Sequence, residues 1–410
     1  MNSRPKIAFV QDALPFQGGA EKVLEAALEA FPEAPIYTLI YRKEAFKGSP
    51  IAEREIHTSL IDKLPAAQAH HRAFLPLMPL AIEQFDLRGY DILLSFSYAV
   101  AHGIRPRPDQ FHISYVYTPM RYAWQRHSQL MEEISSLPAP VRWALRFYLH
   151  SFRKWDFSAA ARVDHFVTVS EWMAGCIQKA YHRPADVLYP PVDLQHFQPL
   201  PPRQEFYVTV SRLVAHKRID VMVDAFNRLG LPLFIIGEGP ELVRLQRTAR
   251  PNVSLLGWQP QDRVAYFLGK AKGFIQANEE DFGIAMVEAQ AAGCPLIALE
   301  GGAAKEIIRP GLTGQFFSEP TAESLEAAIL QFEAASRPFE PALIRKNAER
   351  FDRSRFLQGL LNLVSEDWSR LQESRQKGFA SFRESTLPAT REQISREVEA
   401  LEGGFRTRHF

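Results

Sequence analysis

Strand-sized apolar runs alternate with helical patterns along most of the chain, and the alternation occurs twice. In the first half, residues 6–10 (KIAFV) and 90–96 (YDILLSF) are such runs, and residues 20–31 (AEKVLEAALEAF) have a helical pattern. In the second half, residues 205–210 (EFYVTV) and 273–277 (GFIQA) alternate with further helical patterns. Continuous apolar strands separated by helices predict parallel sheets that are covered on both faces. We therefore expect an α/β protein with two doubly wound domains and a cleft between them, with ligands beyond the carboxyl ends of the strands.

A proline-rich break separates the two halves. Residues 189–204 (YPPVDLQHFQPLPPRQ) contain five prolines and little periodicity, which is typical of an interdomain linker. In the C-terminal tail, Thr390 and Gln393 form a candidate capping box ahead of a short helical pattern. The tail is predicted to pack back on the first domain, with contact to another subunit as the alternative. The predicted divisions are 1–198, 203–350 and a helical C-terminal segment, 351–410.

Composition excludes several classes of protein. The 410 residues suggest two domains, and the apolar content of 46% is sufficient for full cores. Forty-eight basic and 47 acidic side chains give a formal net charge of +1, which argues against a broad nucleic-acid-binding surface. Cys176 and Cys294 are the only cysteines, and neither stands in a metal-ligand spacing. No signal peptide or membrane-spanning run is evident, so we expect a cytoplasmic protein, soluble or at most peripheral on a membrane. The oligomeric state is left open.

Four loops follow predicted strands and precede predicted helices. Residues 17–22 (QGGAEK) include Gly18 and Gly19, whose missing side chains let a ligand approach the backbone. Arg212 and Lys217 follow the strand at 205–210, where two cations suit a diphosphate. The alternatives are a common glycine turn and a solvated basic loop. The two other loops are 235–240 (IIGEGP), with Gly237 and Glu238, and 300–307 (EGGAAKEI).

Carboxylates gather at the start of one predicted helix. In residues 276–295 (QANEEDFGIAMVEAQAAGCP), Glu280 precedes Phe282 and Gly283, and Glu288 follows within the apolar run. Acidic residues also favour the first turn of any helix, so helix capping is the competing interpretation. If one helix carries both glutamates, eight residues separate them by about 12 Å.

Apart from residues 17–22, these loops and the carboxylates belong to one predicted sheet edge in the second half of the chain. Cations and helix N-termini bind phosphates, while carboxylates accept hydrogen bonds from hydroxyls. The combination predicts a ligand with both kinds of group, a nucleotide sugar.

The same motifs carry a family resemblance over residues 6–365. The chain resembles retaining glycosyltransferases of family 4, which have the GT-B fold of two Rossmann-like domains with an interdomain cleft. Residues 115–124 (YVYTPMRYAW) and 161–174 (ARVDHFVTVSEWMA) look like the branch that contains bacterial O-antigen and polysaccharide mannosyltransferases. The branch implies GDP-mannose as donor and a glycan or lipid-linked acceptor. The matching motifs are GGAEKVL, VSRLVAHKRID, IIGEGP, LLGWQP, EEDFGIAMVEAQAAGCPLIA and GGAAKEII.

The resemblance also implies roles for individual residues. Glu280 would bind a hydroxyl of the transferred sugar, and Glu288 the ribose hydroxyls. Arg212 and Lys217 would bind the diphosphate. The first domain would bind acceptor, and the second the donor. The other implied donor contacts are the backbone of Phe282 and Gly283, the loop glycines Gly18 and Gly19, and, around the base, Gly237, Glu238 and Trp258.

One position departs from the family pattern. Where the family commonly has a histidine near the reaction centre, this chain has Tyr117, which is neutral at pH 7 unless perturbed. His102 is a candidate for the missing imidazole, with a structural histidine as the alternative. The family's metal-independent chemistry fits the lack of an Asp-x-Asp motif, and no cofactor is expected. The implied route is front-face substitution with retention of configuration.

A helical segment with aromatic and basic residues points to the acceptor side. Residues 121–157 mix both kinds of side chain, which suits an anionic membrane surface. A helix packed through its aromatics is the alternative.

Other functions also fit parts of the pattern: a nucleotide-sugar epimerase, a phosphorylase or a non-catalytic sugar-nucleotide scaffold. A dinucleotide-dependent dehydrogenase fits poorly, because GGAE lacks the three-glycine fingerprint.

Overall fold

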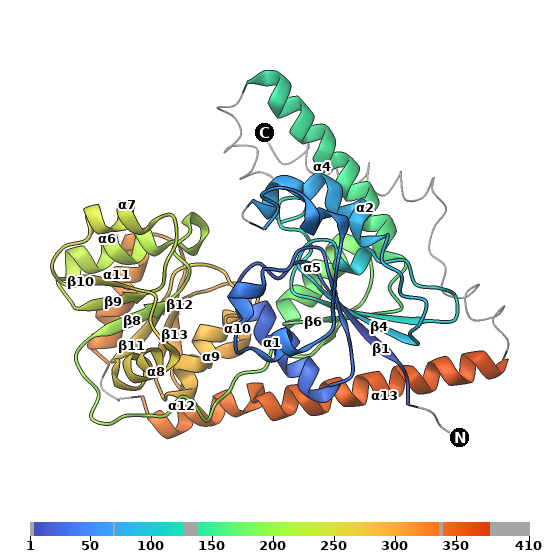
Figure 1. Ribbon diagram of the computed structural model, residues 1–410. Helices are drawn as coiled ribbons and strands as arrows, with labels where there is room; N and C mark the ends of the chain where they lie inside the picture. The colour runs from blue at the N-terminus through green and yellow to red at the C-terminus, as the bar shows by residue number, and fades with distance from the viewer. Residues whose placement is uncertain (1–3, 69, 126–137, 336–338, 378–410) are drawn as a thin grey trace. The chain divides into compact units, whose positions relative to one another are not determined.

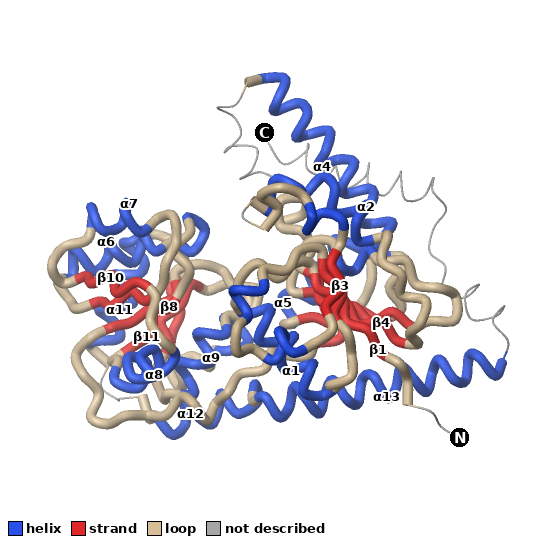
Figure 2. Tube along the Cα trace, in the orientation of Figure 1, coloured by secondary structure: helices blue, strands red, loops and turns tan. Residues whose placement is uncertain are grey.

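The chain forms two compact α/β units, each built around one parallel sheet. The structure is a computed structural model that describes residues 4–68, 70–125, 138–335 and 339–377. Helices lie on both sides of each sheet (Figure 1, Figure 2). The first unit comprises the described parts of residues 1–169, 173–188 and 357–410, and the second comprises residues 170–172 and 189–356. The predicted α/β class with two parallel sheets is confirmed.

The first unit has a sheet of seven strands in the order β3-β2-β1-β4-β5-β6-β7. Every pairing is parallel, with Phe9 of β1 beside Ile36 of β2 and Leu94 of β4. β1 is buried from Ala8 onward, which explains its continuous apolar run. The strands are β1 (Ile7–Gln11), β2 (Ile36–Thr38), β3 (Ile56–Thr58), β4 (Ile92–Ser97), β5 (Phe111–Val116), β6 (His165–Thr168) and β7 (Asp186–Val187). The helices are α1 (Gly19–Ala30), α2 (Met78–Ile82), α4 (Ala139–Ala160) and α5 (Glu171–Tyr181), with 3₁₀ turns η1 (Lys43–Phe46), η2 (Pro50–Glu53), η3 (Leu60–Lys63), η4 (His71–Leu77) and η5 (Ala101–Gly103).

The second unit has a sheet of six parallel strands in the order β10-β9-β8-β11-β12-β13. A buried cluster that includes Met222, Phe226 and Leu325 packs helices α6 and α11 on one face. α6 ends at Leu229 and is capped by Gly230, whose positive φ of +72° suits a left-handed cap. The strands are β8 (Tyr207–Val210), β9 (Leu233–Ile236), β10 (Val253–Gly257), β11 (Gly273–Gln276), β12 (Leu296–Leu299) and β13 (Gly314–Phe317). The helices are α6 (Ile219–Leu229), α7 (Leu242–Thr248), α8 (Gln261–Lys270), α9 (Ile284–Ala291), α10 (Ala304–Ile307), α11 (Ala322–Glu333) and α12 (Pro341–Ala348), with η7 (Ala215–Lys217), η8 (Glu349–Phe351) and the terminal α13 (Arg353–Lys377).

The boundary between the units differs from the predicted one. Residues 189–204 belong to the second unit throughout, so the division falls after Leu188 rather than at residue 198. The segment is not a solvated linker, because Val192, Leu194 and Phe197 are buried. Hydrophobic residues scattered among prolines have no period, and the sequence pattern therefore gave no sign of this packing.

The C-terminal segment begins with α13, whose residues from Leu357 onward belong to the first unit. The predicted capping box at Thr390 lies outside the described residues. Among the helices that the structure describes, none has the length and apolar character needed to cross a membrane.

Candidate functional site

The second sheet has its topological switch point between β8 and β11. β9 and β10 extend the sheet on the β8 side, and β12 and β13 extend it on the β11 side. The loops after β8 and β11 therefore leave the carboxyl edge in opposite directions. In open α/β sheets this is where ligands bind.

Lys217 and Glu280 meet across this switch point. Lys217 ends η7 in the loop after β8, and its Nζ lies 2.5 and 2.6 Å from the two carboxylate oxygens of Glu280, in the loop after β11. The side chains are 17% and 14% exposed. Because little of either charge faces water, their attraction is screened less than that of a surface pair. The fold thus places a cation and a carboxylate together at the carboxyl edge.

Gln276 holds the carboxylate of Glu280, and Asn278 holds Gln276. Gln276 Nε2 donates to Glu280 Oε1 at 3.0 Å and to Asn278 Oδ1 at 2.5 Å. Asn278 Nδ2 donates in turn to the carbonyl of Glu279 at 2.7 Å. Both amides are buried. Sequence reasoning missed them, although polar residues at alternate positions from the end of an apolar strand were a usable signal.

The start of α9 corrects the predicted arrangement of acids. The helix begins at Ile284 and has no acidic residue in its first turn, so Glu280 lies in the preceding loop. The helix-capping interpretation is therefore wrong, and the helical estimate of 12 Å to Glu288 does not apply. Gly283 caps the helix at φ +96°, a conformation that favours glycine. Glu288 is buried in the second turn of α9.

The loop after β9 packs against the loop after β8 through its backbone. A Cβ on Gly237 would stand 1.9 Å from the carbonyl oxygen of Ser211, and φ is +138°, so only glycine fits. The N–H of Leu213 donates to the carbonyl of Glu238 at 2.8 Å. These contacts hold the predicted base-side loop beside the cationic loop.

The remaining donor-side residues differ in exposure. Arg212 is exposed in the loop after β8, and Trp258 is 68% exposed after β10. The N–H of Trp258 lies 3.4 Å from Glu238 Oε1. Phe282 is buried, and its ring packs edge-on against Phe351 at a centroid distance of 5.4 Å. Its ring therefore anchors the loop, consistent with a role for its backbone alone.

In the first unit, Tyr117 has a structural contact. Its hydroxyl donates to the carbonyl of Ala20 at 2.9 Å, in the first turn of α1, where Gly18 is the N-cap and Gly19 the first residue. Burial raises the pKa of Tyr117 well above its usual value, and the nearby Tyr115 and Glu21 act in the same direction. The residue is therefore a neutral phenol that ties the end of β5 to the start of α1.

His102 is enclosed in the core of the first unit. It is 1% exposed, Nδ1 lies 3.0 Å from Ser97 Oγ, and Nε2 lies 3.1 Å from Asp156 Oδ1. Asp156 also accepts from Trp124 Nε1 at 2.7 Å and from the Tyr181 hydroxyl at 2.9 Å. This geometry favours the structural alternative over an imidazole that contacts substrate.

Asp12 is a further organising residue that sequence reasoning missed. It follows β1, is 1% exposed, and accepts four backbone N–H groups, from residues 98–101 after β4, at 2.5–2.9 Å. Burial raises the pKa of Asp12 although these hydrogen bonds lower it. The carboxylate joins the two loops at the switch point of the first sheet, between β1 and β4. Its position directly after a buried strand was the available signal.

No group of three metal-ligating side chains occurs within the described residues. The expectation of metal-independent chemistry stays a prediction.

The two α/β units, each built around one parallel sheet, have the GT-B fold. Solved structures share this fold. The lipopolysaccharide outer core galactosyltransferase WaaB is 16% identical with a TM-score of 0.61, over 88% of this chain and 99% of WaaB. Anabaena HepE, in complex with UDP-glucose, is 16% identical with a TM-score of 0.63, over 88% and 100%.

Family models agree with the fold. The model described as Glycosyltransferase Family 4 matches residues 17–196, and the model described as Glycosyl transferases group 1 matches residues 193–351. The chain belongs to glycosyltransferase family 4.

Curated relatives match over shorter segments. The uncharacterized glycosyltransferase MJ1178 of Methanocaldococcus jannaschii is 28% identical over 131 residues, which are 31% of this chain and 37% of the relative. The N-acetyl-alpha-D-glucosaminyl L-malate synthase of Bacillus anthracis is 29% identical over 119 residues, 27% and 31% of the two chains. The matches thus span about a third of these relatives' length.

Proposed function

We propose that the chain is a retaining, metal-independent hexosyltransferase. It moves a hexose from a nucleotide-diphosphate sugar to a hydroxyl of a glycan or lipid-linked acceptor. The observation that carries the proposal is the Lys217–Glu280 pair at the switch point, in a chain of glycosyltransferase family 4. A cation for the diphosphate and a carboxylate for the sugar hydroxyls are the two contacts that such a donor needs.

The pair is poised for exchange when donor binds. In the structure each charge satisfies the other, so neither is left buried and unpaired. An arriving diphosphate competes for Lys217 Nζ, with the exposed Arg212 guanidinium as a second donor of hydrogen bonds. Glu280 then turns its carboxylate oxygens to a sugar hydroxyl while Gln276 keeps the side chain in place. Phosphate binding and sugar positioning are thereby coupled.

Chemistry follows on one face of the sugar. The bond from the anomeric carbon to the phosphate oxygen breaks as the bond to the acceptor oxygen forms, and the acceptor proton passes to the leaving phosphate. Lys217 and Arg212 stabilise the negative charge that grows on that phosphate. The anomeric configuration is retained, and a product of inverted configuration would overturn this route.

Substitution of the pair tests the site. Lys217→Met should weaken nucleoside diphosphate binding by about 10- to 100-fold, the usual loss for a hydrogen bond to a charged group. Lys272→Met is the matched control, because Lys272 is also paired with glutamates but precedes β11 at the amino edge of the same sheet. Affinity for the nucleoside diphosphate is measured by titration calorimetry. An equal loss of affinity in the two variants would contradict the proposed role of Lys217.

The proposed donor is GDP-mannose, with a UDP-sugar as the alternative. Residues 115–124 and 161–174 support the first, and the HepE complex with UDP-glucose is the observation that favours the second. A thermal-shift panel of GDP-, UDP- and ADP-sugars separates them, because a specific donor raises the melting temperature by mass action. Turnover with acceptor separates a transferase from an epimerase, which needs none, and from a scaffold, which binds without turnover.

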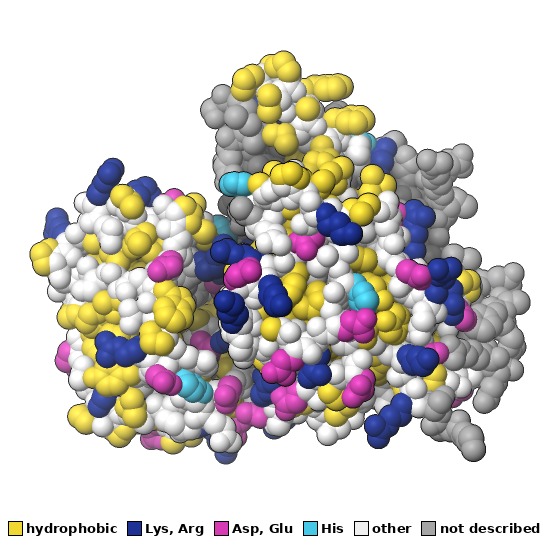
Figure 3. All heavy atoms as spheres, in the orientation of Figure 1, with side chains coloured by type: hydrophobic (Ala, Val, Ile, Leu, Met, Phe, Trp, Pro, Cys, Tyr) yellow, Lys and Arg dark blue, Asp and Glu magenta, His cyan; other side chains and the backbone are white. Residues whose placement is uncertain are grey.

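We propose further that α4 meets an anionic membrane that carries the acceptor. Trp143 and Phe147 are 71% and 63% exposed, and their rings stack at 6.0 Å. Arg142 and Arg146 flank them, and α4 has no acidic residue before Asp156. Figure 3 shows apolar side chains gathered over this helix. Aromatic rings beside cations suit an interface with anionic lipid.

Flotation with phosphatidylglycerol vesicles tests the membrane proposal. Trp143→Ser with Phe147→Ser should abolish flotation, while Tyr266→Ser, which changes an exposed aromatic residue of α8, should not. If wild-type protein does not float with the vesicles, the proposed membrane contact of α4 is wrong.

A further inference from the structure

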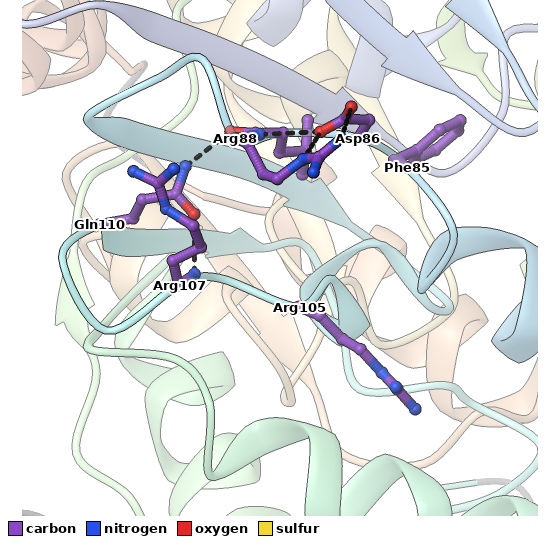
Figure 4. A pocket seen from close by; sticks show the side chains of 7 residues that line it. Phe85, Asp86, Arg88, Arg105, Arg107 and Gln110 are labelled. Carbon is purple, nitrogen blue, oxygen red and sulfur yellow. Dashed lines mark hydrogen bonds and ion pairs between the residues drawn. The ribbon is translucent and has the colours of Figure 1, made fainter.

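A cavity of about 270 Å³ lies in the first unit at the amino ends of β4 and β5. Its walls come from the segment before β4 and the segment before β5. It therefore lies at the opposite edge of the first sheet from the loops at its carboxyl ends that contain Asp12 and Tyr117. The lining residues are Phe85, Asp86, Leu87, Arg88, Arg105, Arg107 and Gln110 (Figure 4).

The lining carries a formal excess of two positive charges, from three arginines and one aspartate. Figure 4 shows Arg88 turned toward Asp86, Arg107 beside Gln110, and Arg105 extending away from both. Arg105 pairs with Glu83 at 2.5 Å, and its side chain extends away from the other two arginines, so we place it at the rim. Arg88 and Arg107 are the cations of the wall.

Gln110 makes the floor of the cavity rigid. Its Nε2 donates to the carbonyls of Leu87 and Tyr90 at 2.6 and 2.8 Å, and its Oε1 accepts from the N–H of Arg107 at 2.7 Å. The side chain is 4% exposed. One buried amide thus joins the two segments that carry Arg88 and Arg107, and fixes the spacing of their backbones.

The ion pairs of the two wall arginines leave them available to a ligand. Arg88 binds Asp86 through Nε and Nη2 at 2.8 and 2.7 Å, and Arg107 binds Asp109 through the same atoms at 2.8 and 2.6 Å. The arginine side chains are 75% and 42% exposed. Exposed pairs between near neighbours contribute little to stability, and each guanidinium has further N–H donors. A phosphate group has more acceptor oxygens and more negative charge than an aspartate carboxylate. It therefore competes well for both guanidinium groups.

We propose that this cavity binds a small ligand that bears a phosphate group, held by Arg88 and Arg107 over the Gln110 floor. The volume is below the range for drug-sized ligands, about 300–1,000 Å³, so it suits a phosphate with a small body attached better than a whole nucleotide sugar. The site is distinct from the Lys217–Glu280 pair, which belongs to the second unit. It does not depend on the proposed transferase activity.

Calorimetric titration with inorganic pyrophosphate tests the site. Lys217→Met serves as the background, because it weakens the phosphate contacts of the second unit. In that background, pyrophosphate should still bind, and adding Arg88→Gln with Arg107→Gln should weaken the binding at least tenfold at low ionic strength. Arg228→Gln is the matched control, because Arg228 of α6 is about half exposed, pairs with Glu323 of α11 and belongs to the second unit. It should leave the affinity within about twofold.

A second experiment distinguishes a soluble phosphorylated ligand from a lipid headgroup. Phosphatidate vesicles replace pyrophosphate as the probe, and flotation is measured for the same variants. Binding of pyrophosphate that depends on Arg88 and Arg107 indicates a soluble phosphorylated ligand. Binding of vesicles alone with the same dependence indicates a lipid headgroup. The proposal is overturned if the binding of neither probe depends on these two arginines, or if Arg228→Gln causes an equal loss of affinity.

Discussion

Gln11 ends β1 with a fully buried side chain, and neither amide atom has a hydrogen-bond partner among the described residues. A buried polar group without a partner costs about 1–3 kcal/mol. Gln11→Leu should therefore raise the melting temperature by a few degrees. Gln110→Leu is the opposite control, because Gln110 makes three hydrogen bonds and its loss should lower the melting temperature. A lower melting temperature for Gln11→Leu would show that the amide has a partner in solution.

Tyr117 stands where a histidine is common in the family, and its geometry gives it a positioning role. Tyr117→Phe removes only the hydroxyl that donates to Ala20. We expect a loss of about 1 kcal/mol in unfolding free energy, with turnover within a few-fold of wild type. Because burial raises the pKa of Tyr117, the two proteins should also share one pH–rate profile between pH 6 and 9. A drop in kcat of a hundredfold or more would instead place the hydroxyl at the reacting atoms.

The residues of the donor edge were predictable to different degrees. Lys217 and Glu280 could be assigned to one edge, because carboxyl ends of parallel strands align. Their direct pairing could not be predicted, because it depends on loop conformations such as the left-handed backbone of Arg218. The alternate polar positions of Gln276, which ends β11, and Asn278 were visible in the sequence, but the contact with Glu280 depends on the conformation of the loop after the strand.

At the scale of elements, long periodic segments were predictable and short ones were not. α1, α6 and α11 carry apolar stripes of 11 or 12 residues, and the structure places α1 one residue from its predicted bounds of 20–31. β7 has two residues, too few to show an alternation, and it was missed. The start of α9 was not predictable, because Phe282 continues the apolar pattern although Gly283 sets the cap.

His165 of β6 links three elements of the first unit and gives their packing a pH dependence. Its Nδ1 lies 2.7 Å from Asp367 of α13, and its Nε2 lies 2.9 Å from Asp186 of β7. Arg370 also binds Asp367, at 3.0 Å. Burial lowers the pKa of His165, but the two aspartates outweigh this effect and raise it overall.

Because folding raises the pKa of His165, its contacts with the two aspartates stabilise the folded protein most at low pH. The unfolded chain has a histidine pKa of about 6.5, so the stabilisation is complete below that pH. It declines as the pH rises toward the folded value and is lost above it. Wild type should therefore lose its stability advantage over His165→Gln between pH 6 and 9, in thermal melts at each pH. Hydrogen exchange in α13 should rise in parallel. A constant difference between the proteins across this range would contradict the linkage.

At the scale of the whole molecule, the two cysteines fall in different units. Cys176 of α5 is partly exposed in the first unit, and Cys294 is fully buried in the second. Burial raises the pKa of the Cys294 thiol to about 12, against a smaller lowering by Arg203. A thiol reagent reacts with the thiolate and must be able to reach it. In the folded unit, Cys294 is protonated and buried, so it meets neither condition. In native protein at pH 8, we expect Cys176 to react first and Cys294 only through opening of the second unit.

This difference makes Cys294 a reporter of which unit a donor stabilises. In the Cys176→Ser variant, labelling of Cys294 measures how often the second unit opens, provided that closing is faster than labelling. A nucleotide sugar that binds this unit reduces the open fraction by mass action, so the labelling rate should fall about 100-fold at 100 times Kd. Lys217→Met should raise the donor concentration needed for a given protection in proportion to the increase in Kd. If a saturating donor that raises the melting temperature leaves the labelling rate unchanged, its binding free energy does not reside in the second unit, and the assignment of the donor site to the Lys217–Glu280 edge is wrong.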